Sequence, residues 1–231
     1  MHLLSAGAVR GLAEAVRPAF EAASKVRVEA VYGAVVAMRE RLDAGAPCDV
    51  LVLTAAMIAA LGKEGRIDAA TAAPLGRVPT AIAVPAGDPV PAVSDGPALA
   101  AALRAASAIH FPDPARATAG IHFVQVLERL GVRAEVEARL RPFPNGAAAM
   151  SALAQVPGTG AIGCTQATEI LYTPGVQLVA ALPPEFALST VYCAAAASGA
   201  LDPALARRFV EALTGDASAA LRRDGGFEPM Q

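Results

Sequence analysis

Short apolar runs alternate, along almost the whole chain, with longer segments in which apolar positions recur every three or four residues. The short runs predict strands, whereas the wider spacing predicts amphipathic helices. The predicted strands span residues 2–6, 26–31, 49–53, 77–84, 108–111, 160–163, 176–181 and 188–196. The predicted helices span residues 9–23, 35–44, 55–61, 97–106, 119–130, 146–154, 203–213 and 216–223. Repeated strand–helix units of this kind predict an α/β fold whose parallel sheets carry helices on both faces.

Prolines and glycines mark the ends of several of these segments. Gly45-Ala46-Pro47 stops the second helix, because glycine suits a helix carboxyl end and proline cannot continue one. Pro18 falls inside the first predicted helix, where it predicts a kink or a boundary. Pro79 lacks the N–H group that a central strand needs, so it predicts an edge strand or a crossover.

The strands near residues 77–84 and 188–196 predict two lobes joined by two crossover strands. We expect residues 1–83 with 189–231 to form lobe I, and residues 84–188 to form lobe II. Ligands of such folds bind at carboxyl ends of strands and amino ends of helices. The expected ligand site is therefore a cleft between the two lobes.

Composition and charge narrow the possible partners. The 231 residues are 55% hydrophobic and 17% charged, which is typical of a globular protein with a substantial core. The net charge is −2, and basic residues form no stripe along the chain. Nucleic acid is therefore not an expected partner.

The chain holds no apolar run of about 20 residues, the length that a membrane-spanning helix requires, so membrane insertion is not expected. The segment from Met1 to Gly7 reads as a first strand and its turn, without the basic and apolar regions of a leader. Two locations follow from this pattern. The protein is periplasmic if a leader has been removed, and cytoplasmic if Met1 is the native start.

The three cysteines, Cys48, Cys164 and Cys193, form no pair with metal-ligand or redox spacing. Cys48 and Cys193 read as small buried hydrophobic residues. The histidines and carboxylates add no metal-ligand motif, and no nucleotide-binding fingerprint is present. We therefore expect neither a metal nor a cofactor.

Two stretches of the chain resemble a known family. Residues 43–53, DAGAPCDVLVL, resemble the Glu-Ala-Gly-Ala-Pro-Ala-Asp run of the periplasmic molybdate-binding (ModA-like) protein family, and residues 111–121, FPDPARATAGI, resemble its Gly-Asp-Pro…Pro-Ala-Gly run. A Gly-Phe pair before the carboxyl terminus is a third match, and the order and spacing agree across nearly the whole chain. The resemblance implies a type II periplasmic-binding-protein fold, in which two α/β lobes close over a small ligand.

Members of this family hold their oxyanion with serine hydroxyls in the first two strand-to-helix turns, with backbone amides and with a tyrosine. Here the first serine position falls on Gly7 or Ala8, and Ser5 lies two residues early. The second turn, Tyr32 to Ala34, carries no serine.

In the second lobe, the tyrosine position of the family falls on Cys164. Only the amide-donating run Thr118-Ala119-Gly120, at a helix start, is retained. A buried tetrahedral dianion needs its hydrogen bonds satisfied, so these departures predict a ligand other than molybdate.

Other residue types at the predicted strand ends suit a small carboxylate. The helix start at Thr118 and Ala119 offers free amides, and Arg116 can add a bidentate guanidinium contact. Thr118 is also a good helix N-cap. The remaining candidate ligand contacts are Ser5, Gly7, Tyr32, Ala34, Thr54, Asn145, Cys164 and Gln166. Each has a plain structural alternative: a loop charge for Arg116, an N-cap for Asn145, and local packing for Tyr32.

Two residues are candidates for catalysis. His122 lies one turn into the helix that follows Arg116, where a general acid or base would be useful, and His110 lies in the preceding strand. Cys164 would be reactive if the carboxyl end of its strand faced a helix amino end. Surface or core packing is the alternative for both candidates.

The leading hypothesis is a solute-binding protein that traps a small organic carboxylate without changing it. If exported, it would deliver that ligand to the permease of an ABC transporter. The alternative is an enzyme on the same scaffold, because the resemblance extends to an aconitate isomerase type, which moves a double bond within an unsaturated tricarboxylate without a cofactor. A ligand sensor is a third possibility, although no DNA-binding segment supports it.

Overall fold

The computed structural model describes residues 1–230 and divides the chain into two units. Unit 1 comprises Met1–Val78 and the chain from Thr190 onward, and unit 2 comprises Pro79–Ser189. These boundaries lie at 78/79 and 189/190, where the sequence analysis placed them at 83/84 and 188/189.

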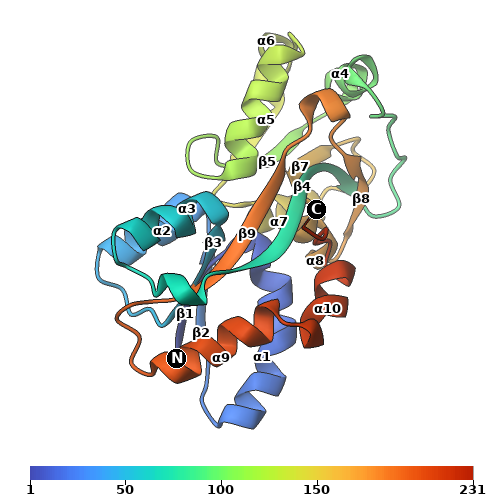
Figure 1. Cartoon of the computed structure of the whole chain (residues 1–231). Helices are drawn as coiled ribbons and strands as arrows, with labels where there is room; N and C mark the ends of the chain where they lie inside the picture. Colours follow the sequence, from blue (N-terminus) through green and yellow to red (C-terminus); the bar gives the residue numbers. More distant parts are fainter. Residues whose placement is uncertain (231) are drawn as a thin grey trace. The chain divides into compact units, whose positions relative to one another are not determined.

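Unit 1 is a four-stranded sheet with helices on both faces (Figure 1). The strand order is β2-β1-β3-β9; the first three strands run parallel and β9 runs antiparallel to β3. Helices α2 and α3 cover one face, and α1 and α9 cover the other. The elements are β1 (His2–Ala6), α1 (Arg10–Ser24), β2 (Glu29–Gly33), α2 (Val35–Asp43), β3 (Val50–Thr54), α3 (Ala55–Lys63), β9 (Ser189–Ala196), α9 (Pro203–Thr214) and α10 (Ala219–Asp224), with single 3-10 turns at Gly7–Val9, Ala69–Thr71 and Asp216–Ser218.

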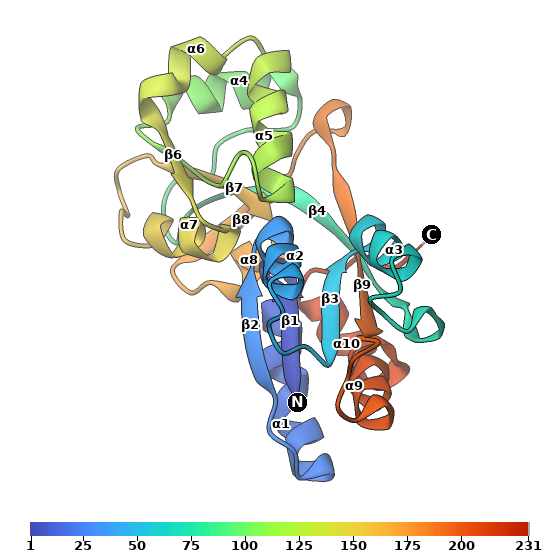
Figure 2. The same cartoon turned by 90° about the vertical axis from the view of Figure 1, so that its left-hand side faces the viewer.

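Unit 2 is a second mixed sheet, of order β8-β4-β7-β5-β6. Strands β7, β5 and β6 are parallel, and β4 runs antiparallel to both of its neighbours. Figure 2 shows α4, α5 and α6 on one side of this sheet and α7 and α8 on the other. The elements are β4 (Ala73–Pro85), α4 (Gly96–Ala105), β5 (Ile109–Pro112), α5 (Thr118–Arg129), α6 (Arg133–Val136), β6 (Leu140–Phe143), α7 (Gly146–Leu153), β7 (Ile162–Gln166), α8 (Ala167–Tyr172) and β8 (Val176–Ala181), with 3-10 turns at Glu137–Arg139 and Pro184–Phe186.

The prolines behave in two ways. Strand β4 begins in unit 1, and its ladder with β7 starts at Thr80, one residue after Pro79. Pro79 therefore lies in the crossover segment just before this ladder, so its missing N–H group removes no bond to β7. Pro18 lies inside α1 on its exposed side, and the helix continues through it to Ser24, so of the two alternatives predicted at Pro18 the boundary is excluded.

Several predicted boundaries and elements differ from the structure. The strand predicted at 26–31 is β2 at Glu29–Gly33, and the one predicted at 160–163 is β7 at Ile162–Gln166. Strand β6 was not predicted, because it is short, half exposed and contains Pro142, so its pattern does not alternate. The six-residue α8 was also missed, since it is too short to show a helical period.

Candidate functional site

The carboxyl ends of the parallel strands of unit 2 meet at one edge of its sheet, because β5 pairs with both β6 and β7. Helices α5, α7 and α8 begin at this edge, directly after those strands. We call it the unit 2 strand-end edge, and it carries Arg116, Thr118, Ala119, Asn145 and Gln166 from the sequence analysis.

At this edge, α7 begins with its amide groups already satisfied by the protein. The Asn145 side chain caps the helix, since its Oδ1 accepts a hydrogen bond from the Ala148 N–H at 2.9 Å. The Glu169 carboxylate of α8 accepts the hydroxyl hydrogen of Thr165 at 2.6 Å and the amide hydrogens of Gly146 and Ala147. Glu169 is buried, and burial raises the pKa of its carboxyl group.

Glycine at position 146 permits this arrangement. A Cβ atom there would overlap Oε2 of Glu169 and Oγ1 of Thr165. The chain therefore brings its own carboxylate against the helix amino end, where the helix dipole and free N–H groups favour an anion.

The first-turn amides of helix α4 are also bonded to carboxylates of the chain. Oδ1 of Asp95 accepts from the Ala98 N–H at 2.8 Å, and Oε1 of Glu185 accepts from the Gly96 N–H at 2.7 Å. Two of the three longest helices of unit 2 thus carry a built-in carboxylate at their amino ends.

Helix α5 carries none. Its N-cap is Ala117, no side chain caps it, and no acidic residue lies in its first turn. The first helical bond runs from the Ile121 N–H to the Ala117 carbonyl oxygen at 2.9 Å, so the amides of Thr118, Ala119 and Gly120 precede the ladder. The prediction that Thr118 is the N-cap was wrong, because the helix already begins at Thr118.

Of the residues around the start of α5, some lie in an exposed loop and others are buried in the core. Arg116 is exposed in the loop before α5, and its N–H, like that of Ala115, donates to Oδ1 of Asp113. Ala119 is buried against the sheet. A Cβ at Gly120 would overlap the carbonyl oxygens of Pro112 and Asp113, so glycine lets the helix start close to the end of β5.

The His122 side chain is hydrogen-bonded to the 3-10 turn at Pro184–Phe186. Its Nε2 lies 2.7 Å from the Phe186 carbonyl oxygen; because a carbonyl only accepts, Nε2 is the protonated nitrogen in this contact. Arg129 of the same helix donates to the Glu185 carbonyl oxygen and stacks on the Phe186 ring at 4.7 Å. One nitrogen of His122 is thus used to hold this turn. His110, the other histidine of this region, is buried beside Phe143 and its pKa is lowered by burial.

The expected position of Cys164 at the carboxyl end of its strand was wrong. Cys164 is the middle residue of β7 and packs, fully buried, in the core with Ile82, Ile109 and Phe123. Burial raises the pKa of its thiol, which opposes a reactive thiolate.

The polar end of β7 is Thr165 and Gln166. Gln166 is buried, forms the N-cap position of α8 and lies opposite Thr80 of β4 in the ladder. The buried Thr80 hydroxyl has no hydrogen-bond partner. Thr80 and Glu169 were not predicted from the sequence, because neither belongs to a motif, although an acid three residues past a strand end is a signal for a helix-end contact.

Unit 1 has a comparable edge. Strands β1 and β2 pair in parallel with Ala6 opposite Gly33, so the 3-10 turn at Gly7–Val9 and helix α2 begin side by side. No side chain caps either start, and neither first turn holds an acid. The α2 ladder begins with Met38 N–H to the Ala34 carbonyl oxygen at 3.0 Å.

The hydroxyl groups predicted for this edge have other partners. Ser5 is fully buried and donates to the Ala6 carbonyl oxygen at 3.1 Å. Tyr32 donates to Oε1 of Glu14 at 2.9 Å, and its pKa is raised by burial, so of the two alternatives the structure has local packing. Thr54 caps α3, accepting from the Met57 N–H at 3.3 Å.

Within residues 1–230, no group of three or more histidine, cysteine or acidic side chains is placed to hold a metal ion. All three cysteines are free. Over the same part of the chain, none of the helices combines the length and the apolar character needed to cross a lipid bilayer.

Comparisons with known proteins agree with this architecture. Residues 1–228 match the model of the family described as bacterial extracellular solute-binding protein. The chain is 26% identical over 236 residues to an aconitate isomerase from a Pseudomonas species, with 100% of this chain and 88% of that protein covered.

Among solved structures, the periplasmic molybdate-binding protein of Azotobacter vinelandii superposes with a TM-score of 0.81 at 18% identity, covering all of both chains. The sulfate-binding protein of Mycobacterium tuberculosis H37Rv gives 0.77 at 21% identity, covering 100% of this chain and 87% of that one. The type II periplasmic-binding-protein fold expected from the resemblance is thereby confirmed.

Proposed function

Because this chain belongs to the family of bacterial extracellular solute-binding proteins, we propose that its solute is a small organic carboxylate bound by the uncapped amino end of α5. The observation that carries the proposal is the contrast within unit 2. The chain supplies its own carboxylate to α4 and α7 and leaves the first-turn amides of α5 without one. A helix amino end in this condition favours an anion from outside.

The donors available fit a carboxylate better than a tetrahedral oxyanion. A tetrahedral dianion has four oxygens to satisfy, and every unmade hydrogen bond in a dry site is costly. The start of α5 offers the backbone amides of Thr118, Ala119 and Gly120, and no side chain caps it. A carboxylate has two oxygens and needs fewer donors.

If the protein is exported, we expect it to deliver this acid to the permease of an ABC transporter.

The test is a calorimetric titration of the protein with succinate, citrate, the aconitate isomers, molybdate and sulfate. We expect a carboxylate to bind most tightly and to raise the free energy of unfolding by about 2.7 kcal/mol at a hundredfold excess over Kd. Tighter binding of molybdate or sulfate than of every carboxylate would refute the proposal.

A matched pair of variants locates the site. Thr118→Pro removes one first-turn amide hydrogen, and proline is well tolerated at the first position of a helix after an extended residue such as Ala117. We expect at least a tenfold loss of carboxylate affinity with unchanged stability. Thr118→Ala keeps the amide and should bind like the parent; equal affinities of the two variants would place the ligand elsewhere.

One observation favours a second function, an isomerase of an unsaturated polycarboxylate. The relative named aconitate isomerase aligns with the whole of this chain. A shift of a double bond needs one positioned acid or base, and His122 lies one helical turn after Thr118. Its Nε2 would have to leave the Phe186 carbonyl oxygen to act.

Proton NMR of each aconitate isomer incubated with the protein in D2O separates the two functions. Interconversion with deuterium incorporation would establish the enzyme, and a rate at least a hundredfold lower in His122→Gln would assign the acid or base. Binding without any change in the spectrum of the ligand would establish a solute-binding protein.

A further inference from the structure

The six backbone N–H groups from Ala115 to Gly120 fall into two sets. The first three are bonded to Asp113. Its Oδ1 accepts from the N–H groups of Ala115 at 2.7 Å and Arg116 at 3.1 Å, and its carbonyl oxygen accepts from the Ala117 N–H at 3.1 Å. The next three belong to the first turn of α5 and precede the helical ladder. One residue thus holds the chain that leads into the helix start.

Asp113 lies between two prolines, close to the first turn of α5. Pro112 is the last residue of β5, and Pro114 has a fixed φ angle and no N–H group. Asp113 is therefore the acceptor for every N–H group between itself and the helix. A Cβ at Gly120 would overlap the carbonyl oxygens of Pro112 and Asp113, so the helix start packs closely against this backbone.

The side-chain bonds of Asp113 restrict the loop more than they stabilise the fold. Ala115 and Arg116 are exposed, so water replaces the carboxylate as acceptor if the side chain is removed. A side chain that accepts two N–H groups of its own loop limits the conformations of that loop. Binding to a loop that is already ordered costs less conformational entropy, which increases affinity.

We propose that Asp113 is a positioning residue of the carboxylate site, because it orders the loop that presents the amides of Thr118, Ala119 and Gly120 to the ligand. Those amides are assigned to a carboxylate by the proposed function, so the role of Asp113 rests on it. Two effects of Asp113 on affinity have opposite signs. Its acceptor oxygen orders the loop and favours binding, whereas its negative charge repels an anionic ligand.

Two substitutions at this position separate these effects. Asp113→Ala removes both the acceptor and the charge, and Asp113→Asn keeps an Oδ1 acceptor while removing the charge. Succinate, citrate and trans-aconitate are titrated into each protein by calorimetry. We expect at least a tenfold loss of affinity in Asp113→Ala, and affinity equal to or higher than that of the parent in Asp113→Asn.

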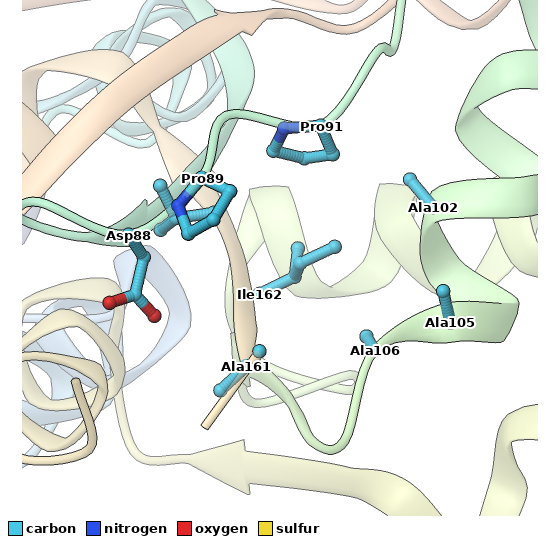
Figure 3. A pocket seen from close by; sticks show the side chains of 10 residues that line it. Asp88, Pro89, Pro91, Ala102, Ala105, Ala106, Ala161 and Ile162 are labelled. Carbon is cyan, nitrogen blue, oxygen red and sulfur yellow. The ribbon is translucent and has the colours of Figure 1, made fainter. Parts of the chain in front are cut away.

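Asp88 provides a matched control in the same unit. Its Oδ1 accepts from the Gly158 N–H at 2.8 Å, and it lies at the amino end of β7, the end opposite to the start of α5. Figure 3 shows Asp88 beside Pro89, at a small pocket that Ala161 and Ile162 also line. Asp88→Ala removes the same charge and a bond to a backbone N–H group, so carboxylate affinity should stay within twofold of the parent.

Hydrogen exchange of the ligand-free protein, followed by NMR, measures the order of the loop without any ligand. We expect the N–H groups of Ala115 and Arg116 to exchange at least fivefold faster in Asp113→Ala than in the parent. In Asp113→Asn they should exchange at the rate of the parent, because the acceptor is kept.

The outcomes distinguish this role from the proposed function itself. Parent-like affinity of Asp113→Ala for all three carboxylates would overturn the role of Asp113 and leave the proposed function intact. Equal losses in Asp113→Ala and Asp113→Asn would also overturn it, as would a loss of affinity without faster exchange at Ala115 and Arg116. If the parent binds none of the carboxylates, the proposed function is refuted and the role of Asp113 with it.

Discussion

Helices α5 and α7 start from neighbouring parallel strands at the same edge of unit 2, yet their first turns differ. At α7, Asn145 and Glu169 satisfy the free amides, and glycine at 146 makes room for the buried carboxylate. At α5, an alanine occupies the cap position and no acid reaches the amides. The comparison teaches that two helices starting at one sheet edge differ in whether the chain supplies an acceptor for their first-turn amides, and the proposed ligand site is the helix start that lacks one.

The largest expected effect comes from disturbing the amino end of α7, whose amides are bonded to Asn145 and Glu169. Gly146→Ala places a methyl group where the Glu169 carboxylate and Thr165 hydroxyl lie. We expect a loss of about 3 kcal/mol in the free energy of unfolding, measured by urea denaturation. Gly62→Ala in α3, whose added Cβ has only ordinary contacts at 3.8 Å or more, is the control and should be neutral or slightly stabilising. Equal effects of the two substitutions would contradict the close contact at Gly146.

The next largest effect comes from giving the start of α5 a capping carboxylate, as the start of α7 already has. Ala117→Asp puts a carboxylate at the N-cap of α5, where it accepts the free amides that we assign to the ligand. We expect about a hundredfold loss of carboxylate affinity, which corresponds to about 2.7 kcal/mol. The neutral cap Ala117→Asn should lose less, because it lacks the charge repulsion. Parent-like affinity of Ala117→Asp in calorimetry would mean that the ligand does not use this helix end.

Replacing the buried Glu169 carboxylate at the start of α7 has a smaller effect. Glu169→Gln keeps the shape of the side chain. It replaces one of the two carboxylate oxygens, which accept hydrogen bonds, with an NH2 group, which can only donate them. We expect a loss of about 2 kcal/mol in stability, the cost of leaving buried amide donors without an acceptor. Carboxylate affinity should stay within threefold of the parent, because the proposed ligand site is the start of α5 and not that of α7. A loss of affinity as large as that of Ala117→Asp would mean that the ligand depends on both helix starts.

The pH dependence of the same variant sharpens this point. Burial raises the pKa of Glu169 in the folded protein above its unfolded value near 4.5, so the folded state binds the proton more tightly. The stability linked to that proton is present below pH 4.5 and is lost as the pH rises through the higher pKa. The difference in stability between parent and Glu169→Gln should therefore be widest at acid pH and narrow on going to neutral pH. A difference that widens instead would reverse the assigned direction.

The smallest effect extends the comparison to unit 1. Tyr32→Phe removes the hydrogen bond to Glu14 at a partly exposed position and should cost about 0.5 to 1 kcal/mol in stability. Because the hydroxyl serves local packing, carboxylate affinity should change by less than twofold. A tenfold loss in calorimetry would return Tyr32 to the ligand set.

The sequence predicted the fold where apolar periodicity is strong. Strands β1 and β8 fall where the pattern placed them, and the match of residues 1–228 to the family agrees with the ordered motifs. The exposed, proline-containing β6 could not be predicted, since its pattern has no period. The helix start near Thr118 and the cap at Asn145 were predictable because both depend on local residues.

The contacts that decide which helix end is free depend on distant parts of the chain. Glu169 reaches Gly146, and Glu185 reaches Gly96, across separations that no local pattern reveals. The burial of Cys164 likewise depends on the extent of β7: the strand was predicted to end at Gly163, three residues before its observed end at Gln166, so Cys164 was given the wrong place. Side-chain identity at a strand end is therefore a weaker guide to a ligand site than the complete set of contacts around each helix start.

Unit 2 is one continuous stretch of chain, whereas unit 1 is assembled from both ends of the chain. During synthesis the ribosome releases β1, β2 and β3 first, but β9, which covers the far edge of β3, emerges only after all of unit 2. Until then Val50–Thr54, whose first four residues are fully buried in the finished protein, has one unpaired edge. Between the synthesis of β3 and that of β9, this sheet edge is therefore open to pairing with other chains, and the arrival of β9 closes it.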